Sequence, residues 1–164
     1  MPTRTHDLCT ALIAKEIDSC IHRFSTECAL PSVLPAFLNV IRNESTSDIF
    51  GYNDCKHKRS PDAAFSHPDD QYPGIVIETS FSQEAKAVEK RADEYVMMSN
   101  GNIKMIISFD VEYRASNRKV DTISVWRSAY GQDQEGPFLY AECISDHEVS
   151  NLQCLLSYPA NRIV

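Results

Sequence analysis

Two short strand-like segments in the middle of the chain each carry one carboxylate. The first runs from Asp62 to Phe65, and the second runs from Gly74 to Ser80 and contains Glu78 after three apolar residues. Two prolines bracket two aspartates between these segments, a composition typical of a turn. An acid that follows such an apolar run is costly unless something compensates its charge. A divalent ion shared by Asp62 and Glu78 would compensate both charges, and oxygen ligands are what Mg²⁺ prefers.

Each acid also has a simpler interpretation. A carboxylate at the end of a strand commonly caps a loop through its neighbouring main-chain amides, or pairs with a surface lysine. Asp62 opens one strand directly after a proline, and Glu78 lies near the end of the next strand. One turn joins the two segments, and this arrangement favours a shared site over two unrelated surface roles.

The size and composition of the chain predict one globular domain over residues 1–164. Hydrophobic residues make up 43% of the chain and charged residues 24%, which is ordinary for a globular protein. We divide it into N-terminal helices (1–45), a core (46–145) and a weakly patterned tail (146–164). No apolar run approaches the length of a membrane span, and the N-terminus lacks the apolar segment of a signal peptide. We therefore expect an intracellular protein with no membrane partner.

The charge of the chain is uneven. A net charge of −7 counts against broad affinity for nucleic acid, which depends on basic residues that neutralise phosphates. Lys56, Lys58 and Arg59 nevertheless precede Asp62 directly, so contact with a phosphate backbone is a hypothesis beside the simpler one of a solvated loop. Six cysteines form no CxxC pair, and Cys55 with His57 is the nearest approach to a zinc half-site.

The remaining pattern predicts helices and strands around the two acidic segments. Apolar residues recur at helical spacing in the expected helices, and apolar or alternating runs mark the expected strands. We predict helices over Asp7–Phe24, Ala36–Arg42 and Gln83–Ser99, and further strands over Asp48–Tyr52, Ile103–Tyr113, Thr122–Trp126 and Phe138–Ile144. Asn100-Gly101-Asn102 should end the third helix. That helix would connect the Glu78 strand to the Ile103 strand in parallel, giving an α/β fold with a central mixed β-sheet flanked by helices.

The residues that carry the two acids also resemble a known family. The segments SPDAAF, PGIVIETSFSQ and GNIKMIISFDVEY, in this order, are similar to the PD-(D/E)XK nuclease superfamily, with its restriction-endonuclease-like fold. The resemblance is closest to Uma-type proteins and related fungal proteins, and it covers about Ser60 to Arg127. Members of this superfamily cut nucleic-acid phosphodiesters with Mg²⁺ or Mn²⁺. DNA is therefore the substrate that the resemblance implies.

The resemblance implies a role for individual residues. Asp62 matches the aspartate of the Pro-Asp motif, Glu78 matches the second acid, and the carbonyl of Thr79 would be a further metal ligand. Glu16 could match the acid that some members carry on the first helix. The family's lysine, two residues after the second acid, is replaced here by Ser80, whose hydroxyl supplies no positive charge.

Relatives that lack this lysine place a basic residue on the following helix. At about 100° per residue, Lys90 lies opposite the apolar stripe of that helix, whereas Arg91 lies on its flank. Arg91 also lies one turn before Tyr95, where RecB-type nucleases have a Gln-xxx-Tyr motif. A guanidinium can bind a phosphate but cannot accept a proton from water. The substitution therefore leaves open a second function, in which a catalytically impaired member of this fold acts as a binding or dimerisation module, alone or as a homodimer.

Three further side chains have two interpretations each. Gln83 could contact the phosphate beside the amides that begin the third helix, or could simply cap that helix. Tyr113 and Trp126 could stack on a base, or could be core residues. A zinc-binding regulator that uses Cys55 and His57 is the remaining alternative.

Overall fold

The computed structural model describes residues 4–27, 33–52, 57–81, 85–111 and 121–149. Within these ranges the chain forms three α-helices and two sheets. The elements are α1 (Arg4–Glu27), α2 (Val33–Leu38), β1 (Arg42–Asn43), β2 (Ile49–Phe50), β3 (Lys58–Arg59), β4 (Ala63–Ser66), β5 (Ile75–Phe81), α3 (Ala85–Met98), β6 (Met105–Val111), β7 (Asp121–Gln132) and β8 (Pro137–Val149). No helix among these residues has the length and apolar character that crossing a membrane requires.

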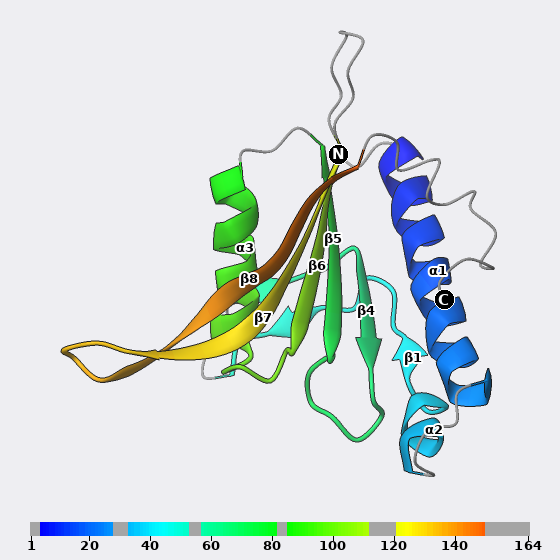
Figure 1. Cartoon of the computed structure of the whole chain (residues 1–164), viewed down its shortest axis with the longest axis horizontal. Helices are drawn as coiled ribbons and strands as arrows, with labels where there is room; N and C mark the ends of the chain where they lie inside the picture. The colour runs from blue at the N-terminus through cyan, green and yellow to red at the C-terminus, as the bar shows by residue number, and fades with distance from the viewer. Residues whose placement is uncertain (1–3, 28–32, 53–56, 82–84, 112–120, 150–164) are drawn as a thin grey trace, which may run out of the picture.

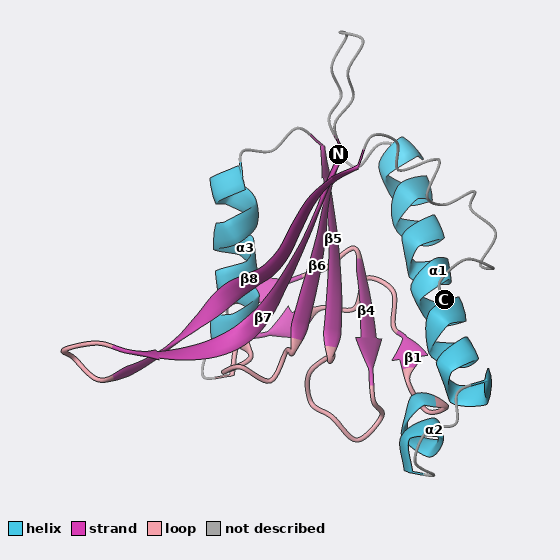
Figure 2. Cartoon of the chain, in the orientation of Figure 1, coloured by secondary structure: helices cyan, strands magenta, loops and turns pink. Residues whose placement is uncertain are grey.

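The central sheet has six strands in the order β1-β4-β5-β6-β7-β8. β5 and β6 are parallel and α3 connects them, whereas the other neighbouring strands are antiparallel. This topology confirms the predicted α/β fold with a mixed sheet and a parallel crossover through the third helix. In Figures 1 and 2, α3 lies on one side of the sheet and α1 on the other.

Each face of the sheet has its own core because successive side chains of a strand point to opposite faces. Val76 belongs to the α3-facing cluster, which includes Ala92, Tyr95 and Val96 of the helix. Ile77, its neighbour, belongs to the cluster that contains Ile13 and Ala14 of α1. The amphipathic pattern of the third helix predicted its buried stripe correctly. The stripe predicted on the first helix was wrong in part, because Leu8, Leu12 and Phe24 are exposed and the buried residues Ile13 and Ala14 lie outside the predicted stripe.

Several predicted boundaries were wrong in the N-terminal half. The second helix begins and ends earlier than the predicted Ala36–Arg42, and Arg42 lies in β1, which pairs with β4. Both residues of β1 are exposed, so no apolar alternation marks this strand in the sequence. The strand predicted over Asp48–Tyr52 is reduced to β2, which pairs with β3 in a separate two-stranded sheet rather than joining the central one.

The last two strands are longer than predicted and form a hairpin that extends beyond the rest of the sheet (Figure 1). The outer half of this hairpin is largely exposed, so its sequence lacks the buried alternation on which the prediction depended. β8 extends to Val149, so the strand predicted to end at Ile144 continues into the first residues of the weakly patterned tail (146–164). The rest of that tail and residues 112–120, between β6 and β7, lie outside the described residues.

Candidate functional site

The pairing of β4 with β5 brings Asp62 and Glu78 to adjoining strands. Ala63 is opposite Ile77 in the antiparallel register, so the positions of Asp62 and Glu78 follow as the next opposed pair. The Asp62 amide donates to the Ile77 carbonyl at 3.1 Å, which extends the pairing one residue beyond β4. The sequence prediction that one turn would join two acid-bearing strands therefore holds for the backbone.

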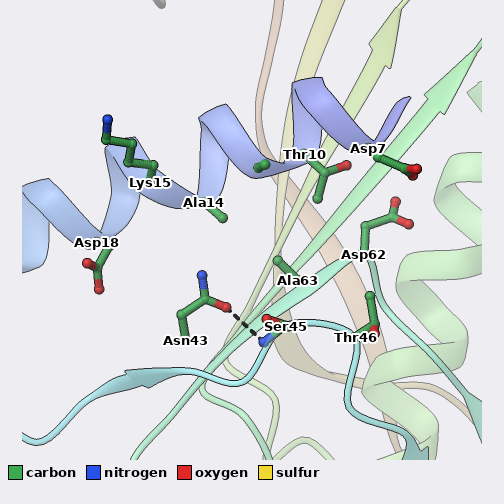
Figure 3. A pocket seen from close by; sticks show the side chains of 11 residues that line it. Asp7, Thr10, Ala14, Lys15, Asp18, Asn43, Ser45, Thr46, Asp62 and Ala63 are labelled. Carbon is green, nitrogen blue, oxygen red and sulfur yellow. Dashed lines mark hydrogen bonds between the residues drawn. The ribbon is translucent and has the colours of Figure 1, made fainter. Parts of the chain in front are cut away.

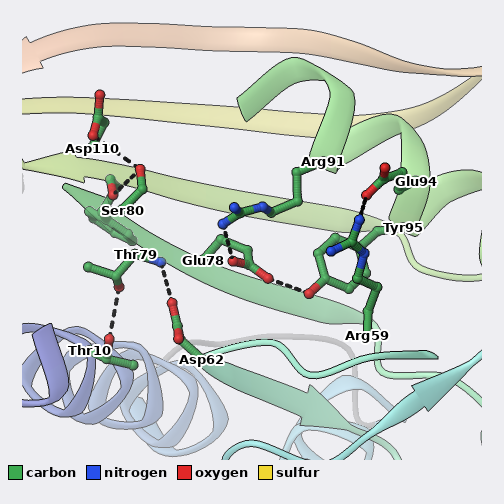
Figure 4. A network of polar contacts seen from close by, with 11 residues as sticks. Thr10, Arg59, Asp62, Glu78, Thr79, Ser80, Arg91, Glu94, Tyr95 and Asp110 are labelled. Atoms are coloured by element: carbon green, nitrogen blue, oxygen red, sulfur yellow. Dashed lines mark hydrogen bonds and ion pairs between the residues drawn. The ribbon is translucent and has the colours of Figure 1, made fainter. Parts of the chain in front are cut away.

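The Asp62 side chain is bound to the main chain of β5. Its Oδ2 accepts a hydrogen bond from the Thr79 amide at 2.6 Å (Figure 4). The Thr79 side chain points to the other face of the sheet, where its hydroxyl accepts from the Thr10 hydroxyl of α1 at 2.9 Å. These contacts fix the position of α1 relative to the point where the two acids lie.

Glu78 is almost buried, with 8% of its surface exposed, and both of its oxygens have partners on α3. Arg91 Nη1 lies 2.8 Å from Oε2, and the Tyr95 hydroxyl donates to Oε1. Arg91 and Tyr95 are four residues apart, so both project from one side of the helix. Figure 4 shows the carboxylates of Glu78 and Asp62 turned to different partners, whereas the sequence predicts that they face one shared ion.

The surroundings of Glu78 change its protonation. Burial raises the pKa of its carboxyl, the Tyr95 hydrogen bond and the Arg91 charge lower it, and the charge of Asp62 raises it again, with a net raised pKa. Burial and the neighbouring Glu78 likewise raise the pKa of Tyr95, which keeps its hydroxyl protonated as a donor. The contribution from Asp62 follows from how close the two acids lie.

The other predicted cations lie elsewhere. Lys90 is exposed on the outer side of α3. Lys58 Nζ pairs with Asp48 at 2.7 Å, and Arg59 pairs with Glu94 of α3, next to Tyr95 (Figure 4). Lys56 and Gln83 lie outside the described residues. Of the two cations predicted on α3, the structure therefore brings Arg91, and not Lys90, to the acid.

Ser80, at the position where the resemblance would place a lysine, points to the same face as Glu78 because the two residues are two apart on β5. Its hydroxyl lies 3.1 Å from Asp110 Oδ1 on β6, directly across the parallel pair. A lysine at this position would pair with Asp110, whereas the serine supplies one hydrogen bond and no charge. Positive charge at Glu78 therefore comes from the helix.

A pocket of about 500 Å³ opens beside Asp62, between α1 and the segment that follows β1. Figure 3 shows the carboxylates of Asp7 and Asp62 at one end of this pocket. Glu16, which the resemblance suggested as the helical acid, is exposed and does not line it. From the sequence, Asp7 is identified only as the start of a helix. Its three-residue spacing from Thr10, on the helix face toward the sheet, is the signal that could have identified it.

The described residues bring together few side chains that could bind the predicted metal ion. Within the described ranges, no group of three or more His, Cys, Asp or Glu side chains is arranged to hold a metal ion. Cys55 and Tyr113 lie outside those ranges, and His57 is exposed. Trp126 belongs to the buried cluster beneath α3, as expected of a core residue rather than a base-stacking one.

Comparison of the chain with protein-family models, with curated proteins and with solved structures found no match in any of the three. What the site can do therefore follows from its own residues. The site contains two carboxylates on adjoining strands, one guanidinium and one buried hydroxyl donor.

Proposed function

We propose that this chain is a metal-dependent phosphodiesterase of the PD-(D/E)XK type that acts on intracellular DNA. The observation that carries the proposal is the opposed placement of Asp62 and Glu78 on adjoining strands, with the Arg91 guanidinium on Glu78. Two acids and one cation at the end of a sheet are the groups that this chemistry requires. The same three residues are those that the resemblance to the superfamily assigns.

The oxygen ligands that the site offers are of the type that Mg²⁺ and Mn²⁺ prefer. Asp62 and Glu78 supply carboxylate oxygens, and Thr79, directly after Glu78 in the sequence, supplies a main-chain carbonyl; all three are hard ligands. A carboxylate offers about four lone-pair sites, so the hydrogen bonds from Arg91 and Tyr95 leave acceptor capacity on Glu78. A bound divalent ion would orient the phosphate, lower the pKa of a water and stabilise developing negative charge.

The protein residues then have distinct roles. Tyr95 holds one oxygen of Glu78 and thereby fixes the rotation of the carboxylate. Arg91 compensates the charge of Glu78. A guanidinium has five N–H groups in a planar fork, so Arg91 can also donate hydrogen bonds to a phosphate. Arg91 remains protonated at working pH and so positions the phosphate without accepting a proton.

One observation favours the second function, a binding or dimerisation module with the same fold. Both oxygens of Glu78 already have protein partners, and Ser80 is engaged with Asp110 where the family has a lysine. A site in this arrangement satisfies its own charges without a metal. In that function the fold would be kept for binding nucleic acid or a second copy of the chain, without cleavage.

Metal titration by calorimetry, combined with nicking of supercoiled plasmid, tests the proposal. The variants are Asp62→Asn and, as a matched control, Asp69→Asn in the exposed turn between β4 and β5. We expect Mg²⁺ binding and nicking in the wild type and in Asp69→Asn, and neither in Asp62→Asn. Metal binding without nicking selects the second function with a retained ion, and nicking that persists in Asp62→Asn overturns the assignment.

A further inference from the structure

Arg59 of β3 and Glu94 of α3 form an ion pair at the edge of the candidate site. Glu94 directly precedes Tyr95 on the helix, and the Tyr95 hydroxyl donates to Glu78. Figure 4 shows the Arg59 guanidinium beside the Tyr95 ring and turned toward Glu94. The sequence groups Arg59 with two lysines as hypothetical phosphate contacts, and the roles derived above for the proposed phosphodiesterase do not include it.

The pairing of β2 with β3 explains why Arg59, and not Lys58, lies at this site. Arg59 is opposite Ile49, a buried residue of the core cluster that faces α3, whereas Lys58 is opposite the exposed Phe50. Successive residues of a strand point to opposite faces. Lys58 therefore points away from α3, and it pairs with the exposed Asp48. The two cations are neighbours in the chain but belong to different surfaces.

The charge of Arg59 acts on the same hydroxyl as the charge of Arg91. Burial and the neighbouring Glu78 raise the pKa of Tyr95, and the charges of Arg91 and Arg59 both oppose this rise. Asp62 follows Arg59 three residues later in the chain, so their Cα atoms are at most about 11 Å apart. A second guanidinium therefore lies near the position where the two acids would place a phosphate.

The ion pair between Arg59 and Glu94 is exposed enough to open. The two side chains are 44% and 31% exposed, whereas the pair formed by Arg91 lies mostly inside the protein. Exposed ion pairs contribute little to stability, because the surrounding water and salt screen the two charges. A guanidinium also binds phosphate oxygens through two charge-assisted hydrogen bonds. A DNA phosphate can therefore replace the Glu94 carboxylate as the partner of Arg59.

We propose that Arg59 is a second phosphate-binding residue of the candidate site and that Glu94 holds it until DNA binds. This inference rests on the proposed function, because it requires a nucleic acid as the substrate. In the free protein the Glu94 carboxylate occupies the guanidinium. When DNA binds, a phosphate takes the place of that carboxylate, so Glu94 competes with the substrate and lowers its affinity.

Fluorescence anisotropy of a fluorescein-labelled DNA duplex measures the contribution of Arg59. Ca²⁺ replaces Mg²⁺ in these titrations because it also binds oxygen ligands, and a gel run after each titration shows whether the duplex is intact. We expect Arg59→Gln to weaken binding by about fivefold. The slope of log Kd against log salt concentration should fall by about 0.9, the value for one lost phosphate contact on duplex DNA. A residue that only attached β3 to α3 would leave this slope unchanged.

A double-mutant cycle tests whether Glu94 competes for Arg59. In Glu94→Gln the guanidinium has no carboxylate to leave, so we expect the duplex to bind about fivefold more tightly than to the wild type. In the Arg59→Gln background the same change removes only the repulsion between the carboxylate and DNA. The gain in that background should therefore be about threefold smaller. An equal gain in both backgrounds would mean that Glu94 acts through its charge alone, and it would overturn the competition.

Asp48→Asn is the matched control for Glu94→Gln. It also removes a carboxylate that is paired with a cation of β3, but on the other face of that strand. Charges more than about 8 Å from the DNA are largely screened at about 0.15 M salt, so Asp48→Asn should bind the duplex within about twofold of the wild type. The unfolding midpoint of each variant shows whether it is folded.

The inference is overturned if Arg59→Gln binds the duplex with the affinity and salt slope of the wild type, or if Glu94→Gln binds it no more tightly. Absence of DNA binding by the wild type also overturns it. Plasmid nicking in Mg²⁺, measured on the same proteins, separates this result from the proposed function. Nicking by the wild type with unchanged binding by Arg59→Gln removes this inference alone. Binding that depends on Arg59, without nicking, removes the phosphodiesterase alone.

Discussion

Arg91 and Glu78 connect the crossover helix to the strand that precedes it, with Nη1 of the arginine 2.8 Å from Oε2 of the glutamate. The pair lies mostly inside the protein, since the arginine side chain is 29% exposed and the glutamate side chain 10% exposed. The charge of Glu78 therefore depends on Arg91 for compensation where water contributes little.

Removal of the guanidinium should destabilise the fold. We expect Arg91→Met to lower the free energy of unfolding by about 1–3 kcal/mol near neutral pH, because it leaves a buried carboxylate without its cation. Arg91→Lys should recover part of this loss. Urea unfolding measures both, and the double variant Arg91→Met/Glu78→Gln is the control, since it has no buried charge to compensate. An equal loss in the double variant would show that the arginine acts through packing alone.

The pH dependence of stability should report on Glu78. Because its folded pKa is raised, the folded state retains this proton over a range in which the unfolded state has lost it. The contribution of this proton to the free energy of unfolding is fully present below the pKa of Glu78 in the unfolded state, and it is lost as the pH rises through the pKa in the folded state. We expect the wild type to lose stability relative to Glu78→Gln as the pH rises from about 4, with no further difference above the folded pKa. Urea unfolding at a series of pH values measures this difference, and a constant difference at every pH would contradict the prediction.

The acids of the site could be predicted because strand pattern and turn chemistry are local. The angle of Arg91 around its helix also follows from the sequence, and the structure places this residue on Glu78. The pairing of Ser80 with Asp110 could not be predicted, since the register of a parallel pair depends on the packing of a whole crossover. Asp7 was missed for a related reason, because its position beside Asp62 depends on how α1 packs against the sheet.

The fold was predicted well where burial is strong and poorly where it is weak. β5 and β6 lie between two buried clusters, so their apolar runs identify them. The two residues of β1 are exposed, and the outer half of the β7–β8 hairpin is a mixture of exposed and half-buried residues, so no alternation of apolar residues marks these strands in the sequence. Their strand structure depends on main-chain pairing, which leaves little trace in composition.

Ser99 should be important for the connection between α3 and β6. It is fully buried, its hydroxyl accepts from the Ile103 amide at 3.0 Å, and it donates to the Tyr95 carbonyl at 2.9 Å. Ser99→Ala leaves that amide unsatisfied, so we expect a loss of about 1–3 kcal/mol in the free energy of unfolding. Ser19→Ala, on the exposed side of α1, should change stability by less than about 0.5 kcal/mol. Thermal and urea unfolding of both variants distinguish the two cases.

The hairpin of β7 and β8 contains a glycine that is covered by an aromatic ring. Gly131 lies directly opposite Phe138 in the antiparallel register, and a Cβ placed on Gly131 would lie 2.4 Å from the ring. Gly131→Ala would therefore displace this ring, which is 44% exposed and free to move outward. We expect a loss of about 1 kcal/mol, since displacing the ring from its rotamer and from its cross-strand contacts costs more than the gain in backbone stiffness returns.

A double-mutant cycle isolates this contact from the backbone effect. In a Phe138→Ala background the ring is absent, so Gly131→Ala should be neutral or stabilising, as alanine is in most strands. The sign of the Gly131→Ala effect should thus reverse between the two backgrounds, and urea unfolding of the four proteins measures the interaction energy. Because the register places this pair and no other across Gly131, equal effects in both backgrounds would mean that the ring does not cover the glycine in solution.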